Sequence, residues 1–203
     1  MQHIEEISRE ARACRVCEAA LPHGVRPVFQ AAAEAPILIA GQAPGRRVHA
    51  SGIPFDDPSG DRLRQWLGVD KATFYDPACF AIIPMGFCYP GTGKSGDLAP
   101  RKECAAIWRE KMLAALPALE LNLLIGQYAQ EWHLGKSKQT LTERVHDWRT
   151  YYDVAPGLVR HLPLPHPSPR NNIWLKRNPW FEENIIPELQ RLVADLLNKK
   201  RAS

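Results

Sequence analysis

A histidine held between prolines is the first feature of this sequence that could take part in chemistry. It lies in the segment His166-Pro167-Ser168-Pro169-Arg170-Asn171-Asn172, directly after an apolar run that ends at Leu164. Proline restricts the backbone conformation, so the flanking prolines would keep the imidazole in a fixed position, where it can donate or accept a proton. Arg170 places a positive charge beside it. A histidine in a loop is usually only a solvated side chain. The motif by itself therefore leaves open whether His166 is catalytic or only solvated.

A glycine-rich turn follows the apolar run at 37–40. It reads Gly41-Gln42-Ala43-Pro44-Gly45, and its two glycines bracket a proline. Backbone N–H groups in such a tight turn can face a bound oxygen. The turn does not match a Walker or Rossmann nucleotide-binding loop, which need a Lys-Ser/Thr pair or a different glycine spacing. On the five residues alone, an ordinary strand-to-helix connection is the simpler interpretation.

Four of the five cysteines have an order that could form a metal site. Cys14 and Cys17 form a C-x-x-C pair, and Cys88 and Cys104 follow. Four thiolates could hold zinc or an iron–sulfur cluster, although free cysteines are also commonly buried without metal. Cys79 adjoins an apolar run and is expected to lie in the core. The spacing alone does not distinguish a metal site from four cysteines that are buried without metal.

These residues need elements that position them, and the apolar pattern indicates which ones. Apolar runs predict buried strands over 37–40 and 80–83, and largely apolar segments predict a third strand over 121–125 and a fourth over 158–164. Helical spacing predicts helices over 3–13, 102–116 and 185–197, and another helix after 126. Capping residues and an early proline predict a helix that starts at 57–61. The basic tail over 195–203 is expected to be frayed. Alternating strands and helices favour a parallel sheet covered on both faces. Its ligands would bind beyond the carboxyl ends of the strands, at the loops after Ile39, Ile83 and Leu164.

Composition limits the class of protein. The chain has 203 residues, of which 45% are hydrophobic, and its 26 basic and 22 acidic side chains give a net charge of +4. The length predicts a single domain over 1–203, or at most two small ones, and the apolar content excludes a disordered chain. The α/β class follows from the alternating strands and helices. No apolar run reaches the ~20 residues of a membrane span. The acidic start does not resemble a secretion signal, so a cytoplasmic location is expected. The tryptophans at 66, 108 and 132 lie in helical patterns and are expected to be core.

Taken together, the motifs resemble the uracil-DNA glycosylase superfamily, and most closely its family 4, the iron–sulfur type. Gly41-Gln42-Ala43-Pro44-Gly45 is similar to the first motif of that family, and Gly52-Ile53-Pro54-Phe55, with Gly60 following, is similar to its Gly-x-Pro-Phe segment. His166-Pro167-Ser168-Pro169 matches the second motif of the superfamily. The four cysteines fall in the order of the cluster ligands. The similarity runs from about residue 10 to residue 195.

The resemblance implies a three-layer α/β/α domain with a central four-stranded parallel sheet, and a DNA glycosylase of base excision repair. His166 and Gln42 would be catalytic, and the extruded base would be bound by Gly41, Gln42, Ala43, Phe55 and His166. DNA would be contacted by Arg46, Arg47, Ser168, Arg170 and Asn171. Cys14, Cys17, Cys88 and Cys104 would hold a 4Fe–4S cluster, with zinc or no metal as the alternatives. The partner would be DNA with a damaged base, with no membrane and no nucleotide cofactor; a monomer is favoured.

Three positions depart from the family pattern. Ala43 stands where the fastest members carry an aspartate that positions the attacking water, and Gln42 replaces a glutamate. Pro84 stands where an asparagine would read the uracil edge. Water would then be positioned by Gln42, by backbone, or by Asp56 or Asp57, of which Asp57 is better suited to cap a helix. The substrate is therefore uracil or another deaminated base, and the alternative is a DNA-binding member with low or no activity.

Overall fold

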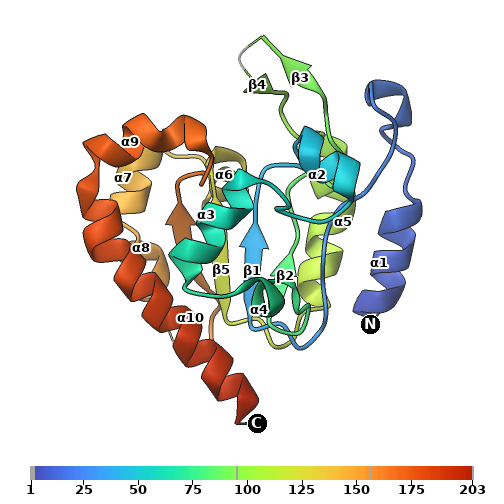
Figure 1. Ribbon diagram of the computed structural model, residues 1–203. Helices are drawn as coiled ribbons and strands as arrows, with labels where there is room; N and C mark the ends of the chain where they lie inside the picture. Colours follow the sequence, from blue (N-terminus) through green and yellow to red (C-terminus); the bar gives the residue numbers. More distant parts are fainter. Residues whose placement is uncertain (1–2, 95, 156, 203) are drawn as a thin grey trace.

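A four-stranded parallel sheet forms the centre of the computed structural model, which describes residues 3–94, 96–155 and 157–202 (Figure 1). Its strands are β1 (Ile37–Ala40), β2 (Phe80–Ile82), β5 (Leu121–Ile125) and β6 (Arg160–Leu164), in the order β2-β1-β5-β6. The chain passes from β1 to β2 on one side and later to β5 on the other. Ligands of α/β folds commonly bind at the carboxyl end of such a switch point.

Helices cover both faces of the sheet, as the alternating pattern predicts. Ile37, Ile39 and their neighbours face α3 (Pro58–Leu67) and α10 (Ile186–Arg201). Leu38 and Ala81 face α1 (Ile4–Ala13) and α5 (Lys102–Ala114), and Ala40 and Leu124 face α6 (Gln127–Leu134). Successive residues of a strand point to opposite faces, so two covering layers favour apolar residues at successive positions, as in β1 and β2. The fold is therefore the predicted three-layer α/β arrangement.

The predicted strand ends differ slightly from the observed ones. The second strand ends at Ile82, and β6 begins at Arg160 rather than at 158. Arg160 is the residue that pairs with Leu121 at the start of β5, whereas Leu158 lies before the ladder and is 62% exposed. The strand therefore begins where its pairing with β5 begins, and Leu158 lies outside that pairing.

The last helix extends further along the chain than the predicted end at 197, into the segment 195–203 that was expected to fray, of which residue 203 lies outside the described residues. Helix α10 continues to Arg201, and Lys199 Nζ lies 2.8 Å from Glu120 Oε1. Basic side chains in the last turn also interact favourably with the helix dipole. A π-helical turn, Phe181–Ile185, precedes α10. No helix in the described ranges is long and apolar enough to cross a membrane.

Shorter elements surround these layers. They are η1 (Glu18–Ala20), α2 (Arg46–Ser51), α4 (Lys71–Tyr75), β3 (Thr92–Gly93), β4 (Gly96–Asp97), α7 (Leu141–His146), α8 (Arg149–Tyr152), η2 (Pro169–Asn171) and α9 (Asn172–Arg177). The strands β3 and β4 form an antiparallel hairpin. The hairpin stands above the carboxyl ends of the sheet strands (Figure 1).

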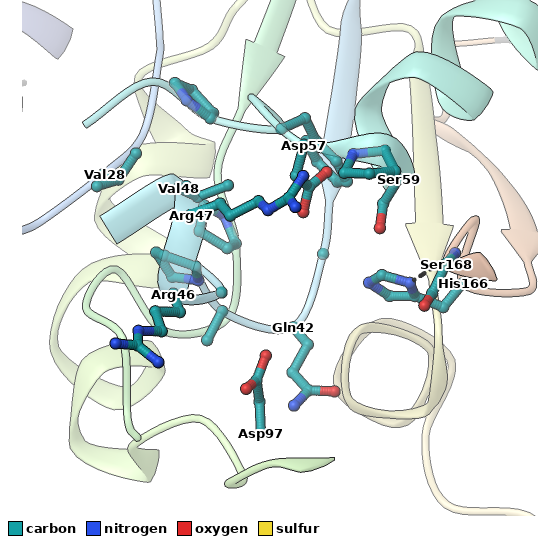
Figure 2. Close-up of a pocket in the computed structure, with 18 of the residues that line it drawn as sticks. Val28, Gln42, Arg46, Arg47, Val48, Asp57, Ser59, Asp97, His166 and Ser168 are labelled. Carbon is teal, nitrogen blue, oxygen red and sulfur yellow. Dashed lines mark hydrogen bonds between the residues drawn. The ribbon is translucent and has the colours of Figure 1, made fainter. Parts of the chain in front are cut away.

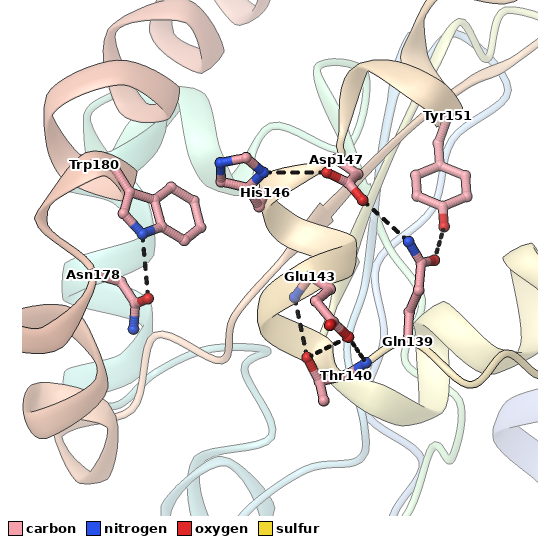
Figure 3. A network of polar contacts seen from close by, with 8 residues as sticks. All are labelled: Gln139, Thr140, Glu143, His146, Asp147, Tyr151, Asn178 and Trp180. Carbon is pink, nitrogen blue, oxygen red and sulfur yellow. Dashed lines mark hydrogen bonds and ion pairs between the residues drawn. The ribbon is translucent and has the colours of Figure 1, made fainter.

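Helix α7 provides a support for the chain that follows the histidine motif. It begins with a capping box, in which Thr140 Oγ1 accepts from the Glu143 N–H and Glu143 Oε2 accepts from the Thr140 N–H (Figure 3). Trp174 of α9 donates its indole N–H to Thr142 Oγ1 at 2.8 Å. The Trp180 ring lies edge-on to His146, 5.2 Å between centroids. Both tryptophans therefore hold the segment after His166 against helix α7.

A buried polar network lies between the sheet and helices α5 and α6. The fully buried Arg109 donates from Nη1 to the Ile83 carbonyl at 2.5 Å and from Nη2 to His133 Nε2 at 2.7 Å. His133 also lies 5.6 Å from the ring of His161. Trp132 was predicted to be core, but it is 38% exposed, with its ring 5.6 Å from the Arg109 guanidinium. The other two predicted core tryptophans, Trp66 and Trp108, are buried, as is Cys79.

This network should make stability depend on pH. Burial, the charge of Arg109 and His161 lower the pKa of His133 from 6.5 to about 2. Below about pH 6.5 His133 binds a proton in the unfolded chain but stays neutral in the folded chain. The free energy of unfolding therefore falls as the pH falls below that value. We expect the free energy of unfolding to fall by about 1 kcal/mol from this residue between about pH 6.5 and 5.5. The measurement is urea unfolding at both pH values.

The matched variant is His133→Gln, whose amide oxygen can still accept from Arg109 but does not titrate. It should remove this part of the pH dependence while keeping the network. Equal pH dependence in the variant and the wild type would contradict the assignment to His133. Burial also lowers the pKa of His161, so some dependence should remain in the variant.

Candidate active site

A cavity of about 570 Å³ opens at the carboxyl ends of the sheet strands (Figure 2). Loops that are distant in the sequence line it, namely the turn after β1, the segment before α3, the β3–β4 hairpin and the loop after β6. The lining includes Gly41, Gln42, Ala43, Arg46, Arg47, Phe55, Asp57, Pro84, Asp97, His166, Ser168, Arg170 and Asn171. Each predicted catalytic, base-binding or DNA-binding residue thus lies at one cavity. Its volume is within the range of roughly 300–1,000 Å³ typical of ligand sites.

The turn after β1 forms a fixed wall of this cavity. The Gly41 carbonyl accepts from the Met85 N–H and the Gln42 carbonyl accepts from the Gly86 N–H, both at 2.9 Å. The Gln42 side chain donates from Nε2 to the Leu98 carbonyl at 3.2 Å. These bonds tie the turn to the segment after β2 and to the segment after the hairpin. The amide of Gln42 is thereby held at the wall of the cavity.

Phe55 is held in an unusual backbone conformation beside this wall. Its φ is 54°, the only positive value at a non-glycine residue in the described part of the chain. A Cβ on Gly41 would lie 3.5 Å from the Phe55 ring, so the ring packs over a residue without a side chain. Residues in sparsely populated conformations cost of order 1–3 kcal/mol and are kept where the surroundings enforce them. Here the first turn of α3 enforces it, because Gly60 packs directly against the Phe55 carbonyl.

Asp57 begins α3 and caps it. Its Oδ1 accepts from the Gly60 N–H at 2.9 Å, which confirms the capping role predicted for this residue. Asp57 also lines the cavity, whereas Asp56 is not among the lining residues. Of the two aspartates considered for positioning water, only Asp57 is therefore in place to do so.

His166 follows β6, and its own loop fixes its protonation. The Ser168 N–H donates to His166 Nδ1 at 3.2 Å (Figure 2). Asn171 Nδ2 donates to the His166 carbonyl at 2.8 Å. Since Nδ1 accepts, the neutral ring carries its proton on Nε2. Burial lowers the pKa of His166, a change opposed by the charges of Asp57 and Asp97 and assisted by Arg170. The ring is therefore a neutral hydrogen-bond donor at neutral pH.

Arg62, which the sequence analysis did not identify, supports this loop from α3. Its Nη1 donates to the Ser168 carbonyl at 3.2 Å and its Nη2 to Asn172 Oδ1 at 2.8 Å. Ser168 also accepts from the Arg170 N–H at 3.2 Å. Ser168 and Asn171, predicted to contact DNA, thus have hydrogen bonds within the loop. No local sequence signal links residues 62 and 168, because only the tertiary fold brings them together.

Charged side chains of both signs line the cavity. Arg46 and Arg47 come from the start of α2, and Arg170 from the loop after His166. Asp97 comes from the end of β4, and Figure 2 shows its carboxylate beside Gln42. Asp97 was not among the predicted site residues. Glycines at 93 and 96 could have indicated a hairpin that returns this side chain toward the first loop.

Pro84 lines the cavity just beyond the end of β2. A proline has no backbone N–H and no side-chain amide, so this position offers a ligand only an apolar surface and a carbonyl. An asparagine there would offer both a donor and an acceptor. The cavity therefore lacks, at this position, the group that the family pattern uses to read uracil.

The four cysteines predicted as ligands line a second, smaller cavity of about 30 Å³. Cys104 Sγ accepts from the Phe87 N–H at 3.3 Å, and burial raises the pKa of the Cys104 thiol to about 12. Burial likewise raises the pKa of Cys88 and Cys17. In the described ranges, no group of three or more His, Cys, Asp or Glu side chains could hold a metal ion. The cysteines are brought together, but not as a preformed site for a single ion.

The comparison with protein families agrees with this architecture. A family model described as the uracil DNA glycosylase superfamily matches residues 28–190, which include both motif loops, Phe55, Asp97, Cys88 and Cys104. Cys14 and Cys17 precede the matched region, so the match does not distinguish the iron–sulfur type from other types. The match covers most of the chain, and the central sheet and its ligand-binding edge have the form expected of these proteins. The chain belongs to the uracil DNA glycosylase superfamily.

Proposed function

We propose that this protein is a DNA glycosylase that hydrolyses the N-glycosidic bond of uracil or another deaminated base in DNA. The observation that carries the proposal is the meeting of His166 and Phe55 in one cavity, a fixed N–H donor and an aromatic ring. Enzymes that act on a base must take it out of the duplex stack and bind it in a pocket. The phenylalanine ring offers the stacking surface, worth about 1–3 kcal/mol per base.

The chemistry follows from the leaving group. Breaking the glycosidic bond leaves positive charge on the sugar and negative charge on the base. The His166 Nε2–H would donate to a carbonyl oxygen of the departing base, where the charge develops. A donor placed in advance in a poorly hydrated site typically contributes about 2.7–4 kcal/mol. Arg46, Arg47 and Arg170 would contact the DNA backbone, which should make binding weaken with salt.

The test is a panel of labelled oligonucleotides that carry uracil, hypoxanthine or xanthine, each in single- and double-stranded form. Release of a base leaves an abasic site, which alkali converts to a strand break. We expect cleavage of at least one member and none of the undamaged strand. Absence of cleavage throughout the panel would overturn the proposal.

Ala43 favours one second candidate, a DNA-binding member with little turnover. A methyl group stands where fast relatives have a carboxylate, so this position cannot activate water. That protein would bind damaged DNA with the salt dependence of phosphate contacts and release no base. Binding and release measured on the same oligonucleotides separate the two functions.

We also propose that the four cysteines hold a 4Fe–4S cluster, as in the family 4 type. The supporting observations are four thiols around one cavity and an N–H donor to Cys104 Sγ, since hydrogen bonds to sulfur are usual around such clusters. Four cysteines also match the four thiolate ligands that a 4Fe–4S cluster takes. The group would act as a structural link between the segment after α1 and helix α5.

Protein purified without oxygen is therefore expected to be brown and to contain iron and acid-labile sulfide. Cys17→Ser should lower both contents and the melting temperature, while Cys79→Ser, outside this cavity, should leave the metal content unchanged. Zinc in place of iron would identify the alternative metal. A metal-free protein whose melting temperature does not respond to Cys17→Ser would contradict any metal site.

A further inference from the structure

Asp97 is a cavity carboxylate that the family motifs do not account for. It ends β4, where its Oδ1 accepts from Thr92 Oγ1 across the hairpin at 3.4 Å. A Cβ on Gly45 would lie 3.4 Å from Asp97 Oδ2, so the carboxylate reaches the turn after β1. Figure 2 shows it directed toward the same space as the Gln42 amide. The hairpin thus brings a carboxylate to the wall where Ala43 lacks one.

Contacts with the histidine loop keep the hairpin at this cavity. The Arg170 guanidinium packs over Gly96, where any side chain would overlap Nη1. The charge of Asp97 is close enough to His166 to oppose the lowering of its pKa. The histidine and the carboxylate therefore act in one electrostatic environment, although they come from different loops.

The negative charge of Asp97 is unfavourable for binding DNA. Its side chain is exposed on the wall of a cavity that must receive a polyanion, and like charges repel. Asp57, the other lining carboxylate, already accepts from the Gly60 N–H at the start of α3. Asp97 has only the weaker partner Thr92 in the described structure, and so is better placed to accept from water.

We propose that Asp97 holds the attacking water and accepts its proton, supplying from the hairpin the carboxylate that Ala43 does not provide. This inference rests on the proposed glycosylase function. The C1′–N bond breaks and its electron pair leaves with the base, whose negative oxygen is bound by His166. The water oxygen bonds to C1′ and one of its protons passes to Asp97. That proton returns through solvent to the base, so one water is consumed per base released.

The test is Asp97→Asn, which keeps the size of the side chain and an oxygen that can accept from Thr92. We expect the single-turnover rate of base release to fall by about 10²-fold, a typical loss for general-base catalysis. Affinity for undamaged DNA should stay equal or rise, because a negative charge is removed. If Asp97 had only a structural role, its replacement would lower both the rate of base release and the affinity for undamaged DNA. Asp61→Asn, an exposed aspartate outside the cavity lining, is the matched control and should keep the wild-type rate.

A binding experiment gives a second readout without turnover. Duplexes that carry a pyrrolidine abasic nucleotide, a cation that mimics the charged sugar, are compared with duplexes that carry the neutral tetrahydrofuran analogue. The wild type should prefer the cation, and Asp97→Asn should lose at least about 10-fold of that preference, since a nearby carboxylate attracts a cation.

The outcomes separate this inference from the proposed function. If the wild type releases a base and Asp97→Asn matches it in rate and in cation preference, the inference is overturned and the glycosylase function stands. Loss of the rate on Asp57→Asn but not on Asp97→Asn would also overturn it. If the wild type releases no base from any oligonucleotide, the function and the inference both fail.

Discussion

Replacement of His166 by leucine should lower the single-turnover rate of base release by about 10²–10³-fold, the usual cost of removing one donor at a developing oxyanion. The expectation depends on the tautomer. Because the Ser168 N–H donates to Nδ1, only Nε2 carries a proton that can be given to the base. Leucine has no donor, whereas His166→Gln retains an amide N–H and should lose less. The measurement is release of the preferred base under enzyme excess at saturating protein.

The control for this experiment is His3→Leu, at an exposed histidine just before α1 that lies outside the cavity lining. It should keep the wild-type rate, and circular dichroism should show all variants folded. Since burial lowers the pKa of His166, the wild-type rate should not show a titration of this residue at about pH 6.5. An active leucine variant would remove His166 from the chemistry.

The sheet could be predicted from the sequence because its strands are buried on both faces. Uniform apolar runs such as 37–40 leave few alternatives once helical patterns separate them. The position of the site follows for the same reason. Parallel strands end at one edge, so the loops after Ala40 and Leu164 must lie on the same side. The distinctive segments at those loops therefore meet in one cavity.

Residues that act across the fold could not be predicted in this way. Asp97 belongs to a hairpin with two residues in each strand, too short for any periodic pattern. Arg62 lies on the polar side of an amphipathic helix and looks like a solvated charge until α3 packs beside the loop at 168. Trp132 shows the opposite error. Its helical spacing indicates a core position, but its ring is partly exposed and lies over the buried guanidinium of Arg109.

The strained conformation of Phe55 also had no sequence signal, yet its cause can be tested at Gly60. A Cβ at Gly60 would overlap the Phe55 carbonyl oxygen and lie 2.8 Å from the Phe55 Cβ. Gly60→Ala should therefore destabilise the protein by about 1–3 kcal/mol, as overpacking does. Alanine is the better helix former by about 1 kcal/mol, so the steric cost must exceed this gain for the sign to hold. Urea unfolding measures the net effect.

Gly41→Ala is the matched control, because it approaches the same ring from the cavity side. Its Cβ would lie 3.5 Å from the Phe55 ring, an ordinary van der Waals contact, so its stability should change little. Gly60→Ala should also lower base release, since a displaced phenylalanine cannot stack on the base, an interaction worth about 1–3 kcal/mol. A Gly60→Ala protein more stable than the wild type would mean that helix propensity dominates at this position. The packing of α3 would then not be what holds Phe55 in place.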